Sequence, residues 1–207
     1  MSGAGAGPLR RTLVLFEGRS DRLAFEALAR RRGVDLDAIA VDLVELDGIT
    51  NLRTRLTALG GSGARVLGLY DAAEERYVSG VLRDLDVLPG DLGARGLGAR
   101  DLGAGGLGAV GFFGCVRDLE DEVIRAAGPD LVLETLAARG ELARFRVFQR
   151  QPAQRVRSIY EQLHRFAGTA AGRKSRFAAD VIEVVPLDRM PEPLTRLLDA
   201  VVSDPQT

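Results

Sequence analysis

Acidic residues stand directly after three separate apolar segments of this 207-residue chain. They are Glu17 after residues 12–16, Asp71 after 65–70, and the group Asp118, Glu120 and Glu122 after 110–116. Carboxylate oxygens are the ligands that Mg²⁺ and Mn²⁺ prefer. Carboxylates gathered in one place repel one another, and they are tolerated chiefly when a cation neutralises them. If the fold brings these residues together, they predict a divalent-metal centre able to act on phosphate esters.

The first of these acids lies in the stretch Phe16-Glu17-Gly18-Arg19-Ser20-Asp21. The apolar residues before it predict a short buried strand, and helical spacing after Ser20 predicts a helix that ends near Gly33. Asp21 would then lie one helical turn from Glu17, so the two acids could share a metal ion. The alternative is that Glu17 is a surface acid at a turn and that Asp21 is a helix-start charge favoured by the helix dipole.

Strands and helices are expected to alternate along the first 128 residues. Strands are expected at 12–16, 41–46, 65–70 and 110–116, and helices at 21–32, 49–59, 72–86 and 118–127. This order predicts an α/β fold with a four-stranded parallel sheet and right-handed crossovers. All strands of such a sheet end at one edge, so the three acidic positions would converge there.

Two segments do not fit this alternation. Residues 1–10 are expected to be disordered, and residues 90–109 are expected to form a flexible insertion, because a Gly-rich five-residue repeat fills 91–110. Residues 11–128 would then form the α/β core. Helical spacing at 131–138, 158–166, 175–182 and 194–202 predicts that 129–204 is a helical C-terminal part of the same unit.

Composition excludes several classes of protein. No apolar run is long enough to span a bilayer and no secretion signal is visible, so a cytoplasmic protein without a membrane partner is expected. With one cysteine and one histidine, Cys115 and His164, a disulfide framework or a Cys/His zinc site is excluded. Cys115 is expected to be a core residue, and His164 to have a structural or phosphate-contact role.

Positive charge is concentrated between residues 139 and 176. This segment holds ten Arg or Lys and two Glu, a net charge of +8 in a chain whose total is −1. A basic region beside an acidic centre suits a phosphate backbone, and the alternative is a solvated helical face. The candidate nucleic-acid contacts are Arg144, Arg146, Arg150, Arg155, Arg157 and Arg173.

Lys174 is the only lysine among 28 basic residues. A compact ammonium suits a single phosphate oxygen or a leaving group better than a guanidinium does, although one lysine could also remain by chance. The surrounding residues 168–175 look superficially like a nucleotide-binding P-loop, but the spacing is wrong and no strand precedes them. We therefore expect no ATP hydrolysis by this chain alone.

The ordered motifs resemble the Toprim domain of the overcoming-lysogenization-defect (OLD) family nucleases. They are Phe16 to Asp21, Gly68 to Glu75, Asp118-Leu119-Glu120 and Gly172-Arg173-Lys174. The resemblance implies a Rossmann-like four-stranded parallel sheet between helices, bound Mg²⁺ or Mn²⁺, and cleavage of DNA rather than RNA. It also implies roles for single residues: Glu17 as metal ligand and general base, Asp21, Asp71 and Glu120 as metal ligands, and Lys174 as the catalytic lysine.

The sequence departs from the family pattern in two ways. Ala73 stands where a second aspartate is expected, so a ligand is missing unless Glu74 or Glu75 reaches the metal. Asp118 or Glu122 could serve in place of Glu120. The ATPase domain that accompanies this Toprim type is also absent, which implies a free-standing nuclease domain or a separate ATPase or other protein partner.

Three hypotheses follow for the function. The first is a Mg²⁺- or Mn²⁺-dependent endonuclease or nickase. The second, motivated by Ala73, is a catalytically impaired Toprim module that binds nucleic acid or a partner protein. The third is a small-molecule phosphotransferase or hydrolase that uses the same acidic edge.

Overall fold

The computed structural model describes residues 11–86 and 106–203. Residues 1–10 and residues 90–105 of the expected insertion lie outside this part of the chain, so the predictions for them are untested. Residues Gly106–Val110 form a short 3₁₀ helix.

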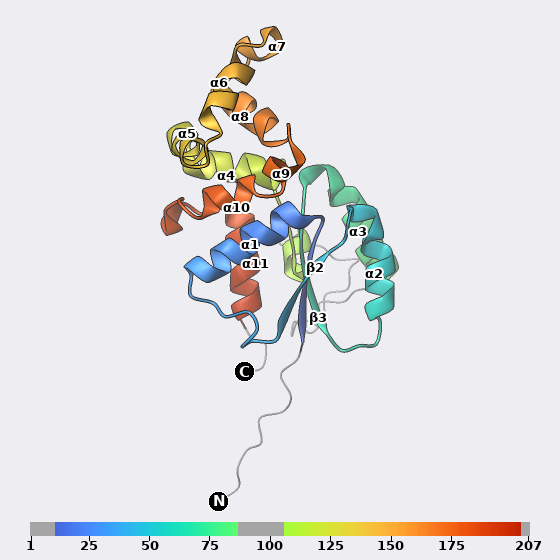
Figure 1. Ribbon diagram of the computed structural model, residues 1–207. Coiled ribbons are helices and arrows are strands. Elements are labelled where there is room, and N and C mark those ends of the chain that lie inside the picture. The colour runs from blue at the N-terminus through green and yellow to red at the C-terminus, as the bar shows by residue number, and fades with distance from the viewer. Residues whose placement is uncertain (1–10, 87–105, 204–207) are drawn as a thin grey trace, which may run out of the picture.

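Four parallel strands form a single sheet in the order β2-β1-β3-β4 (Figure 1). They are β1 (Thr12–Phe16), β2 (Val41–Glu45), β3 (Arg65–Tyr70) and β4 (Phe112–Gly114). Leu15 of β1 aligns with Val44 on one side and with Gly68 on the other. The predicted four-stranded parallel sheet flanked by helices is therefore confirmed.

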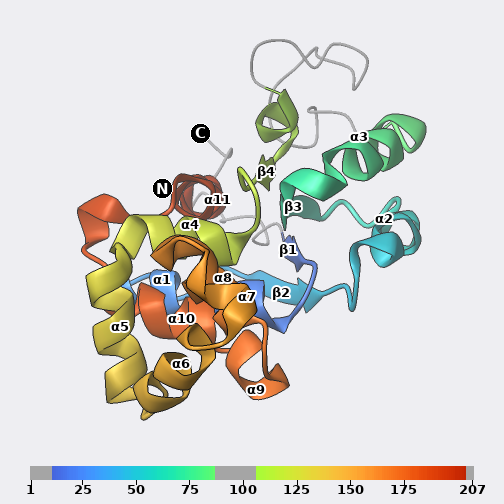
Figure 2. The same ribbon diagram turned by 90° about the horizontal axis from the view of Figure 1, so that it is seen from above.

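Alternate residues of the strands face two separate cores. Val14 and Phe16 belong to the larger core, whereas Leu15 belongs to the smaller one, because successive side chains of a strand point to opposite faces. The larger core is covered by α1 (Arg19–Arg31) and α11 (Glu192–Val202), and the smaller one by α2 (Leu52–Leu59) and α3 (Glu75–Asp84). Figure 2 shows the other C-terminal helices gathered on the α1 side, away from α2 and α3.

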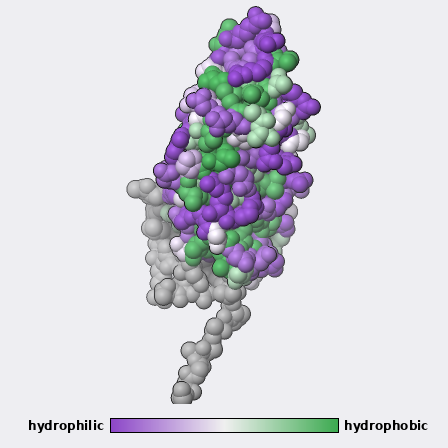
Figure 3. Space-filling view, turned by 60° about the vertical axis from the view of Figure 1, so that its left-hand side comes forward, coloured by the Kyte–Doolittle hydropathy of each residue, from purple (hydrophilic) through white to green (hydrophobic). Residues whose placement is uncertain are grey.

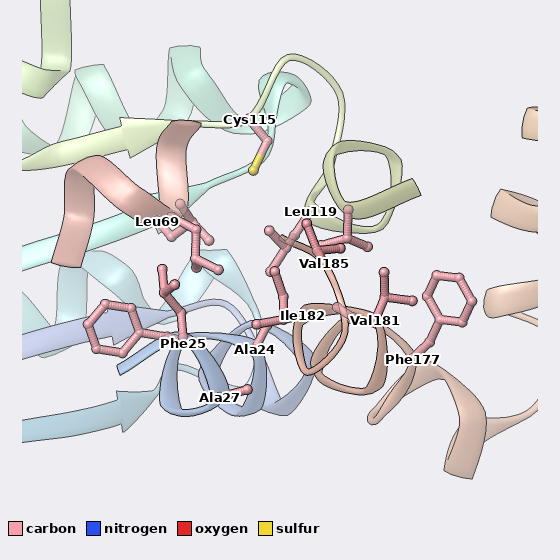
Figure 4. Close-up of a cluster of buried hydrophobic side chains, with 14 of the residues drawn as sticks. Ala24, Phe25, Ala27, Leu69, Cys115, Leu119, Phe177, Val181, Ile182 and Val185 are labelled. Atoms are coloured by element: carbon pink, nitrogen blue, oxygen red, sulfur yellow. The ribbon is translucent and has the colours of Figure 1, made fainter. Parts of the chain in front are cut away.

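Helix α1 packs closely against α10 (Phe177–Ile182) in the larger core (Figure 4). Ala24 and Ala27 provide the α1 surface, and their small side chains let the two helices approach, since the side chains at a contact set the distance between helix axes. Cys115 is buried in the same core, and this burial raises the pKa of its thiol. The thiol therefore acts as a small apolar group.

Helices fill most of the chain after β4. Besides α10 and α11 they are α4 (Leu119–Ala127), α5 (Pro129–Ala138), α6 (Leu142–Gln149), α7 (Pro152–Arg155), α8 (Ile159–Ala167) and α9 (Ala171–Lys174). The larger core contains residues from β1 through to α11, so the first 128 residues and the later helices share it. No helix in the described part of the chain is both long and apolar enough to cross a bilayer.

Three details differ from the sequence-based expectation. The helix expected at 175–182 is α10, which begins two residues later at Phe177, and the short helix α9 at Ala171–Lys174 precedes it. The helix expected from Ala72 begins instead with a 3₁₀ helix at Ala72–Glu74, and α3 starts at Glu75. The strand expected at 110–116 is reduced to Phe112–Gly114, because the preceding 3₁₀ helix and the left-handed backbone of Gly111 (φ 85°) delay its start.

Helices α6, α7 and α8 form an arm that projects from the rest of the molecule (Figure 1). An aromatic cluster joins α6 to α8: the rings of Phe145 and Phe166 meet edge to face with centroids 5.1 Å apart, and Phe148 lies 5.5 Å from Phe166. Such pairs contribute about 0.5–1.5 kcal/mol beyond the area that they bury. These three rings belong to the larger core and extend it into the arm.

Gly68 is required by the packing of β4 on β3. A Cβ at this position would lie 2.7 Å from two carbons of the Phe112 ring, which is itself buried. We expect Gly68→Ala to lower the free energy of unfolding by about 1–3 kcal/mol, the usual cost of overpacking. Gly80→Ala in α3 is the matched control, because no atom lies within 4 Å of its added Cβ and alanine favours a helix. Urea denaturation measures both, and equal stabilities of the two variants would contradict the packing argument.

Candidate functional site

One hollow of about 580 Å³ collects side chains from the carboxyl edge of the sheet. Six residues singled out from the sequence line it: Glu17, Asp21, Asp71, Asp118, Glu120 and Lys174. Glu17 and Asp71 follow adjacent parallel strands, Asp118 and Glu120 follow β4, and Lys174 ends α9. The fold thus brings residues from positions 17 to 174 into one place.

Two other candidate ligands do not line this hollow. Glu75 is exposed and lines a different hollow of about 370 Å³, together with Tyr70 and Arg196. Glu122 accepts a hydrogen bond from the backbone N–H of Val116 at 2.8 Å, through its Oε1 atom. The structure therefore does not bring Glu75 or Glu122 together with Glu17 and Asp71.

The carboxylates in the hollow repel one another. Burial raises the pKa of Asp21 well above its usual value, and the charges of Glu120 and Asp71 raise it further, against a hydrogen bond from the Gly18 N–H at 3.3 Å. Burial raises the pKa of Asp71 to about 7, with added contributions from Asp118 and Glu120. These shifts are those expected for a group of like charges without a counterion.

Glu74 takes part in the same electrostatic group. Burial raises its pKa to about 7, and contact with the Glu17 carboxylate and the charge of Asp71 add to the shift. Its Oε2 atom is buried and has no hydrogen-bond partner among the described residues. Ala73, in contrast, is exposed. The residue after Ala73 therefore places a carboxylate beside Glu17, although Glu74 is not among the residues that line the hollow.

Asp118 is already engaged by other groups. Its Oδ1 accepts the backbone N–H of Asp121 at 2.8 Å, which caps α4, and His164 Nε2 lies 2.9 Å from Oδ1 and 2.7 Å from Oδ2. Glu120 accepts a single hydrogen bond of 3.0 Å from the Ser20 hydroxyl, through Oε1. Of the acids after β4, Glu120 is therefore better placed than Asp118 to take up a ligand.

Asp47 and His164 line the hollow but were not identified from the sequence as members of the site. Asp47 follows β2 just as Glu17 follows β1, so the rule of acids after strands could have found it. Its backbone is left-handed (φ 55°), and the next residue, Gly48, donates its N–H to the Glu17 carbonyl at 3.1 Å. The role of His164 depends on α8 packing near α4, which no local sequence pattern reveals.

The candidate nucleic-acid contacts fall into two groups. Arg173 is engaged internally: its side chain is 11% exposed, it pairs with Glu141, and its guanidinium lies 3.8 Å from the centroid of the Phe166 ring. Arg144 also pairs with Glu141, at 2.8 Å. The other group belongs to the projecting arm and comprises Arg146, Arg150, Arg155 and Arg157.

The side chains at the hollow fit a hard divalent cation. The donors are carboxylate oxygens, and the pKa values of Asp21 and Asp71 are raised first by burial and then by neighbouring carboxylates. Glu74, beside Glu17, has a buried oxygen without a hydrogen-bond partner among the described residues. In residues 11–86 and 106–203, no group of three or more Asp, Glu, His or Cys side chains is arranged so that it could hold a metal ion by itself. Mg²⁺ does not need one, because it usually keeps several water ligands and binds through one or two carboxylates.

Comparisons with known proteins agree with the sequence motifs. Residues 10–72 match the family model described as overcoming lysogenization defect protein-like, TOPRIM domain. The C-terminal region of the Xanthomonas campestris pv. campestris OLD protein is 22% identical, with a TM-score of 0.62 over 93% of this chain and 94% of that one. The C-terminal region of the Burkholderia pseudomallei OLD protein is 18% identical, with a TM-score of 0.61 over 93% and 96%. No curated protein sequence matches the chain.

The resemblance to the OLD-type Toprim domain is therefore confirmed. The family model matches the stretch that contains Glu17, Asp21 and Asp71, and the solved structures share the whole architecture of sheet and helices. At these identities the structures establish the fold alone.

The raised carboxylate pKa values predict that the metal-free protein loses stability as the pH rises from 6 to 8. Unfolded Asp and Glu titrate near about 4, whereas Asp71 and Glu74 titrate at about 7 in the folded protein. The folded state therefore holds more protons than the unfolded chain between about pH 4 and 7, so the free energy of unfolding falls across this interval and the fall is complete once the pH has passed 7. Thermal unfolding in EDTA should show the loss, and Asp71→Asn should reduce it. The account would be contradicted if the thermal stability of the wild type rose between pH 6 and 8, and rose faster than that of Asp71→Asn.

The pairing of His164 with Asp118 predicts a different effect. His164→Ala leaves a half-buried carboxylate without its partner and should lower the free energy of unfolding by about 1–3 kcal/mol. His164→Gln should recover part of this loss, because a glutamine amide can donate from nearly the position of Nε2. Urea denaturation of both variants tests the contact, and equal destabilisation by alanine and glutamine would count against it.

Proposed function

We propose that this chain is a divalent-metal-dependent phosphodiesterase that cleaves or nicks DNA. The observation that carries the proposal is the convergence of Glu17, Asp21, Asp71 and Glu120 in one hollow with Lys174. The family match over residues 10–72 supports it, because that stretch supplies three of these acids. We also propose that residues 11–128 and 129–204 act as one Toprim unit, since the larger core draws on both.

The acids at the edge of the sheet would hold Mg²⁺ or Mn²⁺. Bound there, the cation would lower the pKa of water and stabilise negative charge on a phosphate. Glu17, Asp21, Asp71 and Glu120 are the proposed ligands, and Glu74 takes the place of the missing second aspartate. Mutual repulsion favours binding, because each carboxylate gains a counterion that it lacks in the free protein.

The remaining residues of the hollow would act on the substrate directly. Glu17 is the proposed general base, which accepts the proton of the attacking water at its carboxylate. Lys174, at the end of α9, lines the same hollow, and its ammonium would contact an oxygen of the scissile phosphate. The arginines of the arm would hold the phosphate backbone on either side of the cut. A separate ATPase or other protein partner remains a prediction.

A second function is favoured by one specific observation. The described residues contain no closed cluster of three ligands, and Ala73 removes one expected carboxylate. A module that binds DNA or a partner protein without cutting it would keep the fold and the basic arm but not the metal affinity. The two proposals therefore differ in metal binding as well as in cleavage.

Nicking of supercoiled plasmid tests the leading proposal. In the presence of Mn²⁺ we expect nicked circles, with activity reduced at least about 100-fold by Glu17→Ala or Lys174→Ala, a loss typical of acid–base or electrostatic groups. Glu75→Ala is the matched control, because Glu75 lies outside the hollow and should leave the rate unchanged. Retention of DNA on a gel without nicking by the wild type would favour the second function.

Calorimetric titration with Mn²⁺ tests the proposed role of Glu74. Glu74→Gln keeps the size of the side chain but removes the charge, and we expect it to weaken Mn²⁺ binding about tenfold or more. Glu75→Gln should leave the affinity unchanged, because Glu75 lies outside the hollow. Equal effects of Glu74→Gln and Glu75→Gln would exclude Glu74 as a ligand.

A further inference from the structure

The tip of the projecting arm carries an exposed valine between two arginines. Residues 155–157 read Arg-Val-Arg and form the turn between α7 and α8. Val156 is 87% exposed, more than any other large apolar side chain in the described part of the chain. Figure 3 shows the arm at the top of the molecule, with hydrophilic and hydrophobic side chains intermixed on its surface.

A buried polar network holds this turn in one conformation. Gln162 of α8 donates its Nε2 to the carbonyls of Gln154 at 2.9 Å and Arg157 at 3.1 Å, on either side of Val156. Gln149 of α6 donates to Gln162 Oε1 at 2.6 Å, so all three segments of the arm are joined. Gln154 and Gln162 are both buried. The valine is therefore presented on a rigid support, and little conformational entropy would be lost when a partner binds.

The surroundings of Val156 are basic. Arg146, Arg150, Arg155 and Arg157 lie on the same three segments, and the nearest acid in the sequence is Glu161, whose carboxylate is 4.0 Å from the Arg157 guanidinium. Two of these arginines are braced by backbone carbonyls: Arg155 donates to Arg150 at 2.7 Å and Arg157 to Ala153 at 3.0 Å. An apolar side chain surrounded by arginines matches the minor groove of a duplex, where proteins insert apolar wedges between phosphate contacts.

Helix α8 sets the distance between this tip and the hollow. It begins just after the turn, and His164 and Gly168, near its other end, line the hollow. Five residues of helix, about 8 Å at 1.5 Å per residue, lie between Ile159 and His164. Val156 lies three residues before Ile159, and these residues add at most about 10 Å. Since a duplex rises about 3.4 Å per base pair, the whole separation corresponds to about two to five base pairs.

We propose that the arm is a wedge for duplex DNA, with Val156 inserted in the minor groove about two to five base pairs from the phosphate held at the hollow. The arginines of the arm contact the phosphates on either side of the inserted valine. This inference rests on the proposed function for its register, because the hollow must hold a phosphate. The groove contact itself does not require cleavage.

Binding of a fluorescent DNA duplex in EDTA tests the wedge separately from catalysis. Val156→Ser should weaken binding about five- to tenfold, as expected for loss of one buried valine contact, and should leave the salt dependence unchanged. Arg150→Gln should reduce the slope of log affinity against log salt by about one. Val184→Ser is the control, because Val184 is also exposed, at 45%, but lies beyond α10. Thermal unfolding would verify that each variant is folded.

The outcomes distinguish failure of the wedge from failure of the nuclease proposal. Weaker binding by Val156→Ser with no nicking by the wild type supports the wedge and overturns the nuclease. Unchanged binding by Val156→Ser overturns the wedge, whether or not the wild type nicks DNA. Equal loss of affinity for an RNA duplex of the same sequence overturns the assignment to the minor groove of DNA, because A-form RNA has a wide and shallow minor groove.

Discussion

Repulsion among carboxylates at one edge of the sheet is the constraint on which the rest of this structure depends. Parallel strands deliver Glu17 and Asp71 to the same edge, and the start of α4 adds Asp118 and Glu120. Burial and mutual repulsion raise the pKa values of Asp21, Asp71 and Glu74. A folded protein that keeps acids so close gains stability whenever a cation binds there. The same electrostatic cost that destabilises the free site would therefore be the source of the proposed affinity for metal.

The other elements can be understood as supports for this edge. The Asp118 carboxylate caps α4 and binds His164, which fixes α8 against the start of α4. Since α8 leads directly into α9, that contact also determines where Lys174 lies. At its other end α8 carries the glutamine network of the arm, so a single helix joins the acidic hollow to the basic surface. A rigid connection of this kind would keep the proposed phosphate contacts in register with the proposed metal ligands.

The sequence predicted the fold well, because its signals were local and strong. Apolar runs such as 12–16 and 65–70 can only be buried strands, and glycine-bounded helices between them leave a parallel sheet as the natural arrangement. The convergence of Glu17 and Asp71 followed from that topology. The start of β4 was placed too early because the 3₁₀ helix before it has no distinctive pattern.

Contacts between distant side chains could not be predicted in the same way. Nothing in the residues around Ala73 distinguishes Glu74 from Glu75, since the choice depends on whether the 3₁₀ helix turns one or the other toward Glu17. Arg173 looked like a phosphate contact from its charge alone, but the fold stacks it on Phe166 and pairs it with Glu141. Asp47 is different, because it follows the expected strand at 41–46 directly and its sequence position is therefore a sufficient signal for its place in the hollow.

Proton release during metal binding tests the central claim most directly. Titration of the protein with Mn²⁺ at pH 7, in two buffers with different ionisation enthalpies, measures both the binding and the protons released. With Asp71 and Glu74 titrating at about 7, we predict that binding displaces protons and that Glu17→Ala abolishes both signals. Two results would contradict the account. One is absence of Mn²⁺ binding, and the other is Mn²⁺ binding that releases no protons and is retained by Glu17→Ala.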